Sequence, residues 1–221
     1  MSKWILLLVL VSRALFGAIG CTLSNPAEDL KYLYPGMTSY KEDLREFPRI
    51  ANGATLFKGL QARLGSDLDP IYETYETPYT VYSVFQGTTK IGIVHGVNVP
   101  GKGGVIQVFL SLDPGTAVVQ KFFFQRLESP AAKALRAKEF RDQFTGLTLA
   151  DFYKHDYYAV AEPGARADRV GALKAPVVDA GGRPDYLATL RIRKNLILLD
   201  SFVFGQRFEP FFERARKAKK Q

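Results

Sequence analysis

The chain has 221 residues, 47% of them hydrophobic, and a mean hydropathy of −0.07, which is the composition of a soluble globular protein with a single core. Its one cysteine excludes an internal disulfide framework, and with only two histidines, His95 and His155, neither a zinc site nor an attached haem is expected. The formal net charge is +8, but the basic residues are scattered apart from a C-terminal cluster, so no nucleic-acid partner is expected.

The first twenty residues have the pattern of a secretion signal. Lys3 is followed by an uninterrupted apolar run over residues 5–11 and then by small residues. The segment Ala18-Ile19-Gly20-Cys21 resembles a lipobox, the motif at which bacterial lipoproteins are lipidated on the cysteine and cleaved before it. We therefore expect a signal peptide over residues 1–20 and a lipid on Cys21. The mature protein is then anchored to a membrane of the bacterial cell envelope and faces the periplasm or the exterior.

Two other interpretations of this N-terminus remain open. An uncleaved membrane anchor has only the sixteen residues 5–20, which include Arg13, whereas a span needs about 20 apolar residues. An ordinary signal peptide would require the only cysteine of the chain to fall at the lipidation position by chance. Residues 21–26 are expected to form a short tether.

Residues 27–78 have a mostly helical pattern and are expected to form a helical N-terminal segment. Apolar residues such as Leu56, Leu60 and Leu64 recur at helical spacing, and Gly65 is a natural stop.

The pattern changes to strands at residue 79. Strands are expected over residues 79–86, 90–99, 105–112 and 117–126, because these stretches are rich in β-branched and aromatic residues and are separated by glycine-containing turns. Such short connections require antiparallel neighbours. The predicted fold class is α+β, with an antiparallel β-meander of about four strands flanked by helices.

Helices are expected after the strands. Ser129 and Pro130 have the pattern of an N-cap and a first helical residue, and Pro184 opens a helix to about Leu199. We assign residues 79–210 to one α+β domain and 211–221 to a basic tail. That tail is either a solvated helix end or a segment attracted to anionic lipid headgroups beside the anchor.

Several segments of this domain resemble the flavin mononucleotide (FMN)-binding domain family, which includes the small periplasmic subunits of the sodium-translocating NADH:quinone oxidoreductase and of a related electron-transport complex. Residues 101–106 (Gly-Lys-Gly-Gly-Val-Ile) resemble its G-x-GG-x-I segment. The strand 108–113, the segment 128–131 (Glu-Ser-Pro-Ala) and the Phe-x-x-Gln-Phe stretch 140–144 follow in the family's order. The resemblance covers residues 79–152.

The resemblance implies an FMN-binding protein that serves in electron transfer with a redox partner protein. Members that hold flavin covalently use a threonine in a Ser-Gly-Ala-Thr segment, and the comparable place here holds no threonine, so any flavin is expected to be non-covalent. The expected cofactor-binding residues lie in three segments: Gly103 and Gly104; Glu128, Ser129 and Pro130; and Gly181, Gly182 and Arg183.

Structural roles remain open for the same residues. Ser129 has the pattern of a plain helix cap, and Gly103 and Gly104 that of a bulge at the start of a strand. The alternative function is a lipoprotein binding or assembly module that keeps the fold without flavin. No Gly-x-Ser-x-Gly or His-Glu-x-x-His motif is present and no catalytic residue can be assigned, so a turnover enzyme is less expected than an electron-transfer or binding protein.

Overall fold

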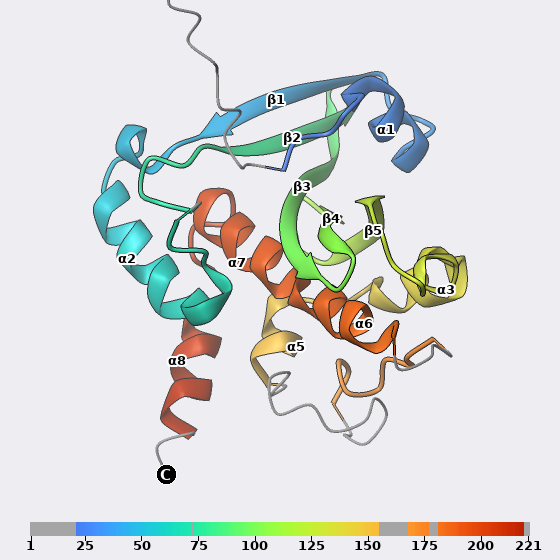
Figure 1. The fold of residues 1–221 in the computed structure, drawn as a ribbon. Helices are drawn as coiled ribbons and strands as arrows, with labels where there is room; N and C mark the ends of the chain where they lie inside the picture. Colours follow the sequence, from blue (N-terminus) through green and yellow to red (C-terminus); the bar gives the residue numbers. More distant parts are fainter. Residues whose placement is uncertain (1–20, 72, 155–167, 177–180, 219–221) are drawn as a thin grey trace, which may run out of the picture.

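The computed structural model describes residues 21–71, 73–154, 168–176 and 181–218, which are arranged around a five-stranded antiparallel sheet (Figure 1). The expected signal peptide and part of the irregular stretch before residue 182 lie outside these residues. Each strand pairs with its neighbours in the sequence, so the predicted α+β meander is confirmed. The strands are β1 (Ser39–Arg45), β2 (Tyr79–Gln86), β3 (Thr89–Gly101), β4 (Gly104–Leu112) and β5 (Val119–Arg126).

Strand β1 corrects the prediction of a mostly helical segment over residues 27–78. It pairs with β2 from Ser39 opposite Phe85 to Arg45 opposite Tyr79, without a bulge. Its sequence, Ser-Tyr-Lys-Glu-Asp-Leu-Arg, is mostly charged, because an edge strand is exposed along one side and buries few side chains. The sheet therefore continues across the boundary expected at residue 78.

The sheet has an apolar layer on each face. Ile106, Val108, Leu110 and Leu112 share one face of β4, as their alternation predicts, and all belong to the larger core. Phe109 points to the other face and belongs to a smaller core. A sheet buried on both faces explains the nearly continuous apolar runs of its central strands.

Helices cover both faces of the sheet (Figure 1). The larger core lies under α2 and the C-terminal helices, and α1 covers the smaller core. The helices are α1 (Pro26–Leu33), α2 (Gly53–Leu64), α3 (Ala132–Arg136), α4 (Lys138–Arg141), α5 (Leu149–Lys154), α6 (Arg183–Thr189), α7 (Arg193–Phe202) and α8 (Glu209–Ala218). Short 3₁₀ turns are η1 (Phe47–Arg49), η2 (Gly65–Asp67), η3 (Asp142–Phe144) and η4 (Leu190–Ile192).

The C-terminal helices differ from the prediction in two ways. The single helix expected from Pro184 to about Leu199 is divided into α6, η4 and α7 and ends at Phe202. The expected basic tail is helical as far as Ala218, as part of α8. This helix lies at the opposite end of the molecule from α1 (Figure 1), so its basic residues are not beside the segment that begins at Cys21.

The residues expected to form a tether instead lie against the sheet. Cys21 forms an antiparallel bridge with Gly96 of β3, and the Leu23 N–H donates to the Tyr82 hydroxyl at 3.1 Å. Gln125 of β5 accepts from the Ser24 N–H at 2.9 Å and donates to the Thr22 carbonyl at 3.1 Å. Leu23 is buried in the smaller core, and burial of apolar surface is what holds this segment in place.

None of the helices within the described ranges combines the length and the hydropathy required to cross a bilayer.

Candidate functional site

The glycine-rich connection between β3 and β4 is a tight hairpin. Gly101 and Gly104 are its last paired residues, so only Lys102 and Gly103 form the turn. A Cβ atom added to Gly103 would lie 2.2 Å from the carbonyl oxygen of Glu128, closer than any real contact. The glycine is therefore required by the close approach of two backbone segments. Gly104 has a φ of +131°, a conformation that favours glycine.

The segment Glu128 to Pro130 follows β5 and lies against this hairpin. The Ser129 hydroxyl donates to Asp185 at 2.5 Å and accepts from the Ala131 N–H at 3.1 Å. The expected helix begins later than predicted, at Ala132, and its N-cap position is Ala131. Ser129 is therefore not the helix cap, and α3 is too short, at five residues, to present an anion site at its N-terminus.

The Glu128 side chain lies beside the hairpin, with one carboxylate oxygen 3.9 Å from the position that a Cβ atom on Gly104 would take. Its carboxylate is 58% exposed and accepts from Arg126 through Nε at 3.0 Å and Nη2 at 2.8 Å. An exposed ion pair of this kind contributes little to stability.

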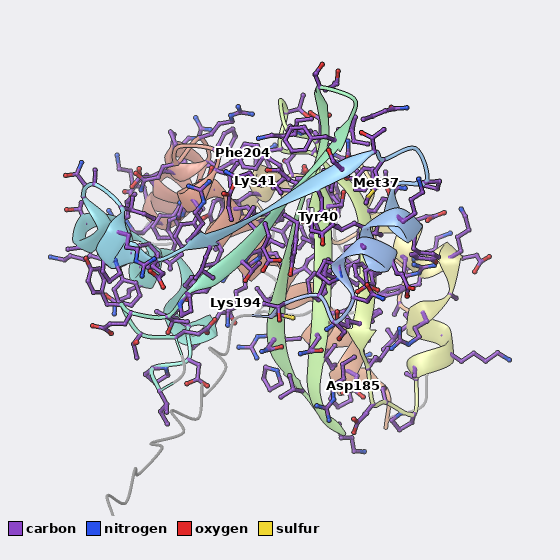
Figure 2. The ribbon with its side chains drawn as sticks, turned by 90° about the horizontal axis from the view of Figure 1, so that it is seen from above. Met37, Tyr40, Lys41, Asp185, Lys194 and Phe204 are labelled. Atoms are coloured by element: carbon purple, nitrogen blue, oxygen red, sulfur yellow. The ribbon has the colours of Figure 1, made fainter. Side chains whose placement is uncertain are left out.

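Asp185 joins the predicted segments at the tip of the hairpin (Figure 2). Its carboxylate is fully buried, and it accepts from the Lys102 N–H at 2.6 Å and from the Ser129 hydroxyl at 2.5 Å. It stands in the first turn of α6, two residues after Arg183. No sequence pattern indicates this role, since the residues that Asp185 contacts lie 56 and 83 positions away along the chain.

The third predicted segment opens α6. Gly182 is buried and its carbonyl accepts from the Tyr186 N–H at 3.1 Å, while Gly181 and Arg183 are half-buried. The four residues before Gly181 lie outside the described residues. The three predicted segments are thus brought together through Asp185, although the first two contact each other directly and enclose no groove that the described residues reveal.

An open groove of about 530 Å³ lies next to this junction, between α3, α4 and residues 174–176. Gln143 of the Phe-x-x-Gln-Phe segment fixes one wall: its amide donates to the Lys174 carbonyl at 3.1 Å and accepts from the Lys174 N–H at 2.7 Å. The Phe140 ring connects the groove to α6 through an edge contact with Tyr186, with centroids 5.9 Å apart. The residues that line the groove are Ala134, Ala137, Glu139, Phe140, Gln143, Lys174, Ala175 and Pro176.

Cys21 lies in the smaller core and not on the surface. Its side chain is 4% exposed, and burial raises the pKa of its thiol to about 12. The thiol is therefore neutral and unreactive while this segment stays on the sheet.

Replacing Asp185 by alanine should lower the free energy of unfolding by about 2 kcal/mol, because two partly buried hydrogen bonds lose their acceptor. Ser129→Ala removes one of these bonds and leaves the Lys102 N–H paired, so it should cost about 1 kcal/mol. Urea unfolding followed by circular dichroism measures both. Equal losses below about 0.5 kcal/mol would show that Asp185 does not hold the three segments together.

Comparisons with known proteins leave the chain without a family. No protein-family profile matches it, and no curated protein matches it in sequence. Among solved structures, NqrC from Shewanella oneidensis is similar over 90% of this chain and 93% of that chain, with a TM-score of 0.47 and 14% sequence identity. At this score and identity, the likeness assigns no function to the chain.

Proposed function

We propose that this chain is a lipid-anchored protein of the bacterial cell envelope that binds FMN non-covalently and serves in electron transfer. The observation that carries the proposal is the groove of about 530 Å³. Phe140 and Gln143, which line it, come from a segment that resembles the FMN-binding family, and its Phe140 wall contacts the helix that follows Gly181, Gly182 and Arg183. Cofactor sites in proteins commonly measure about 300–1,000 Å³, so the groove has room for a flavin.

The lining of the groove fits the chemistry of FMN. Ala134, Ala137 and Ala175 are half-buried and offer an apolar surface to a planar ring system, and the buried Phe140 ring lies behind them. Lys174 supplies a cation at the rim that suits a phosphate, and Glu139 adds one carboxylate to the lining. Bound flavin would supply the redox chemistry, while the protein sets its position and its potential.

In this proposal the β3–β4 hairpin and Glu128 to Pro130 support the site and do not contact the ligand. The Glu128 carbonyl already occupies the space beside Gly103, so no ligand can enter there. Both carboxylate oxygens of Asp185 already accept hydrogen bonds. The flavin is therefore placed in the groove and not between these two segments.

The purified protein should show the two absorbance bands of flavin, or acquire them when FMN is added, and acid or heat should release the flavin into the supernatant. Ala137→Trp places an indole in the groove and should weaken FMN binding about tenfold or more, measured by quenching of flavin fluorescence. Glu128→Gln is the matched control outside the groove and should leave the affinity unchanged.

Two results would contradict this proposal. A fluorescent band that survives a denaturing gel would show that the flavin is covalent. A folded Ala137→Trp variant with undiminished affinity would remove the groove from the site.

The second candidate function is a binding or assembly module that keeps the fold without flavin. Two observations favour it. Residues 181–183 contain no threonine, and the Glu128 carbonyl fills the space beside Gly103 of the β3–β4 hairpin. A wild-type protein that binds no FMN at millimolar concentration would decide for this module.

The lipid anchor requires the first residues to leave the sheet. A diacylglyceryl group on the sulfur of Cys21 does not fit a side chain that is 4% exposed. Release of residues 21 and 22 breaks the isolated bridge to Gly96 and the hydrogen bond from Gln125 to the Thr22 carbonyl and exposes the small Cys21 side chain, while Leu23 can stay in the smaller core. The lipobox-like sequence around Cys21 supports this part of the proposal.

Cys21→Ala should abolish membrane association in the native host and leave a precursor that keeps its signal peptide. The same substitution in the folded domain removes one small buried side chain and should cost only about 1 kcal/mol. Fractionation and intact mass spectrometry check this result. Unchanged mass and unchanged membrane association would mean that Cys21 is only a core residue.

A further inference from the structure

Strand β1 presents a long edge of the sheet. Its seven residues contain no proline and pair with β2 without a bulge, and β2 is the one strand that pairs with it in the part of the chain that the structure describes. Seen from above, no helix lies over β1, and Tyr40 and Lys41 stand along it (Figure 2). An edge of this length is a template for pairing with another strand.

The exposed side chains of β1 include two large apolar groups on one face. Tyr40 is 37% exposed and Leu44 is 55% exposed, and alternation places both on the face of the smaller core, opposite Val84 and Thr80 of β2. On the other face, Lys41 and Asp43 form an ion pair at 2.7 Å. Tyr40 also contacts the Tyr82 ring and Asp43 also pairs with Arg45, but the exposed parts of Tyr40, Lys41 and Leu44 remain accessible to a partner.

We propose that β1 pairs in antiparallel fashion with β1 of a second copy of this chain and joins the two sheets into one. The sequence of β1 favours a second copy of the same strand as the partner, because an antiparallel pairing centred on Glu42 places complementary side chains opposite each other. In this register Tyr40 stands opposite Leu44 of the second copy, and Lys41 stands opposite its Asp43, and each match occurs twice because of the twofold symmetry.

Neighbouring symmetric registers are worse. Centring the pairing on Lys41 sets two lysines against each other, and centring it on Asp43 opposes two aspartates and brings Lys41 against Arg45. The favoured register has one unfavourable match, Glu42 against Glu42. The strand also buries less area than a stable interface needs, so the dimer is weak and concentration-dependent.

Mixing two charge variants tests the register. Lys41→Asp makes all charges at positions 41 and 43 negative, and Asp43→Lys makes them all positive, so each variant alone should be monomeric. An equimolar mixture should form heterodimers, because both pairs between positions 41 and 43 are then of opposite charge, and the match of Glu42 with Glu42 is the same as in the wild type. Sedimentation velocity of the purified full chain over a range of concentrations measures this, with circular dichroism to show that both variants are folded.

Two further variants keep the proposal falsifiable if the charge variants do not fold. Glu42→Gln removes the one repulsive match and should tighten the dimer about threefold. Leu44→Lys should make the protein monomeric, whereas Ile71→Lys, at an apolar position outside β1 that is more exposed than Leu44 (74% against 55%), should not. A wild-type chain and a Glu42→Gln variant that both stay monomeric at millimolar concentration, or a mixture of folded charge variants that stays monomeric, would overturn the proposal.

Discussion

Replacing Arg63 by methionine should lower the free energy of unfolding by about 3–5 kcal/mol, one of the largest losses that a single substitution causes in this chain. Arg63 of α2 is 3% exposed and donates to Asp200 of α7 at 2.5 Å and to the Tyr153 hydroxyl of α5 at 2.8 Å. The substitution leaves Asp200 buried without its cation. Urea or thermal unfolding at neutral pH measures the loss.

The double variant Arg63→Met/Asp200→Leu separates a buried charge from a packing defect. Because it removes both charges, it should recover most of the stability lost in Arg63→Met. One Arg63 nitrogen, Nη1, is buried and has no hydrogen-bond partner in the described residues. The apolar pair removes this unpaired donor together with the two charges. A double variant as unstable as the single one would show that the ion pair itself is net stabilising.

The protein should lose stability steadily as the pH falls from about 6.5 towards 3, by up to about 4 kcal/mol from one histidine. His95 of β3 is 1% exposed, and burial, together with the charge of Lys194, lowers its pKa from 6.5 to about 3. In this window the unfolded chain binds a proton at His95 and the folded chain does not, so acid favours unfolding. Above pH 6.5 this contribution to stability is fully present.

His95→Gln is the variant that isolates this effect, because carboxylates such as Asp113 also titrate in acid. Hydrogen bonds from Thr116 lower the pKa of Asp113, so its contribution is lost at still lower pH. Unfolding free energies measured at pH 8, 6, 5 and 4 should fall less steeply in the variant than in the wild type. Parallel curves for the two proteins would show that His95 is protonated in the folded state or reached by water.

The β-branched and aromatic content of the central strands made them predictable. Strand β2 begins and ends where the sequence predicted, because its Val and Tyr residues are buried and its turn carries Gly87 with a φ of +60°. Strand β1 was missed because its formation depends on pairing with β2 and not on an apolar pattern of its own. The strand propensity of a segment by itself does not show which other strand it will pair with.

The candidate site was predictable in its segments but not in its geometry. The order of glycine, Glu-Ser-Pro and Phe-x-x-Gln-Phe segments is visible in the sequence. That Gly103 touches the Glu128 carbonyl, or that Asp185 binds Ser129, depends on contacts between distant residues. Gly103 was expected to bind the cofactor, whereas in the structure the Glu128 carbonyl occupies the space beside it.

The meander order of the sheet has a consequence for how the chain folds. The strands from β2 to β5 follow one another through short connections, so each of these pairings closes a loop with little entropy cost and can form early, whereas residues 46–78 separate β1 from β2. The contacts that attach the helices span far more chain: 137 residues between Arg63 and Asp200, and 100 between His95 and Asn195. Backbone amides of β3 and β4 should therefore exchange with deuterium most slowly, while α1, α2 and α8 open first.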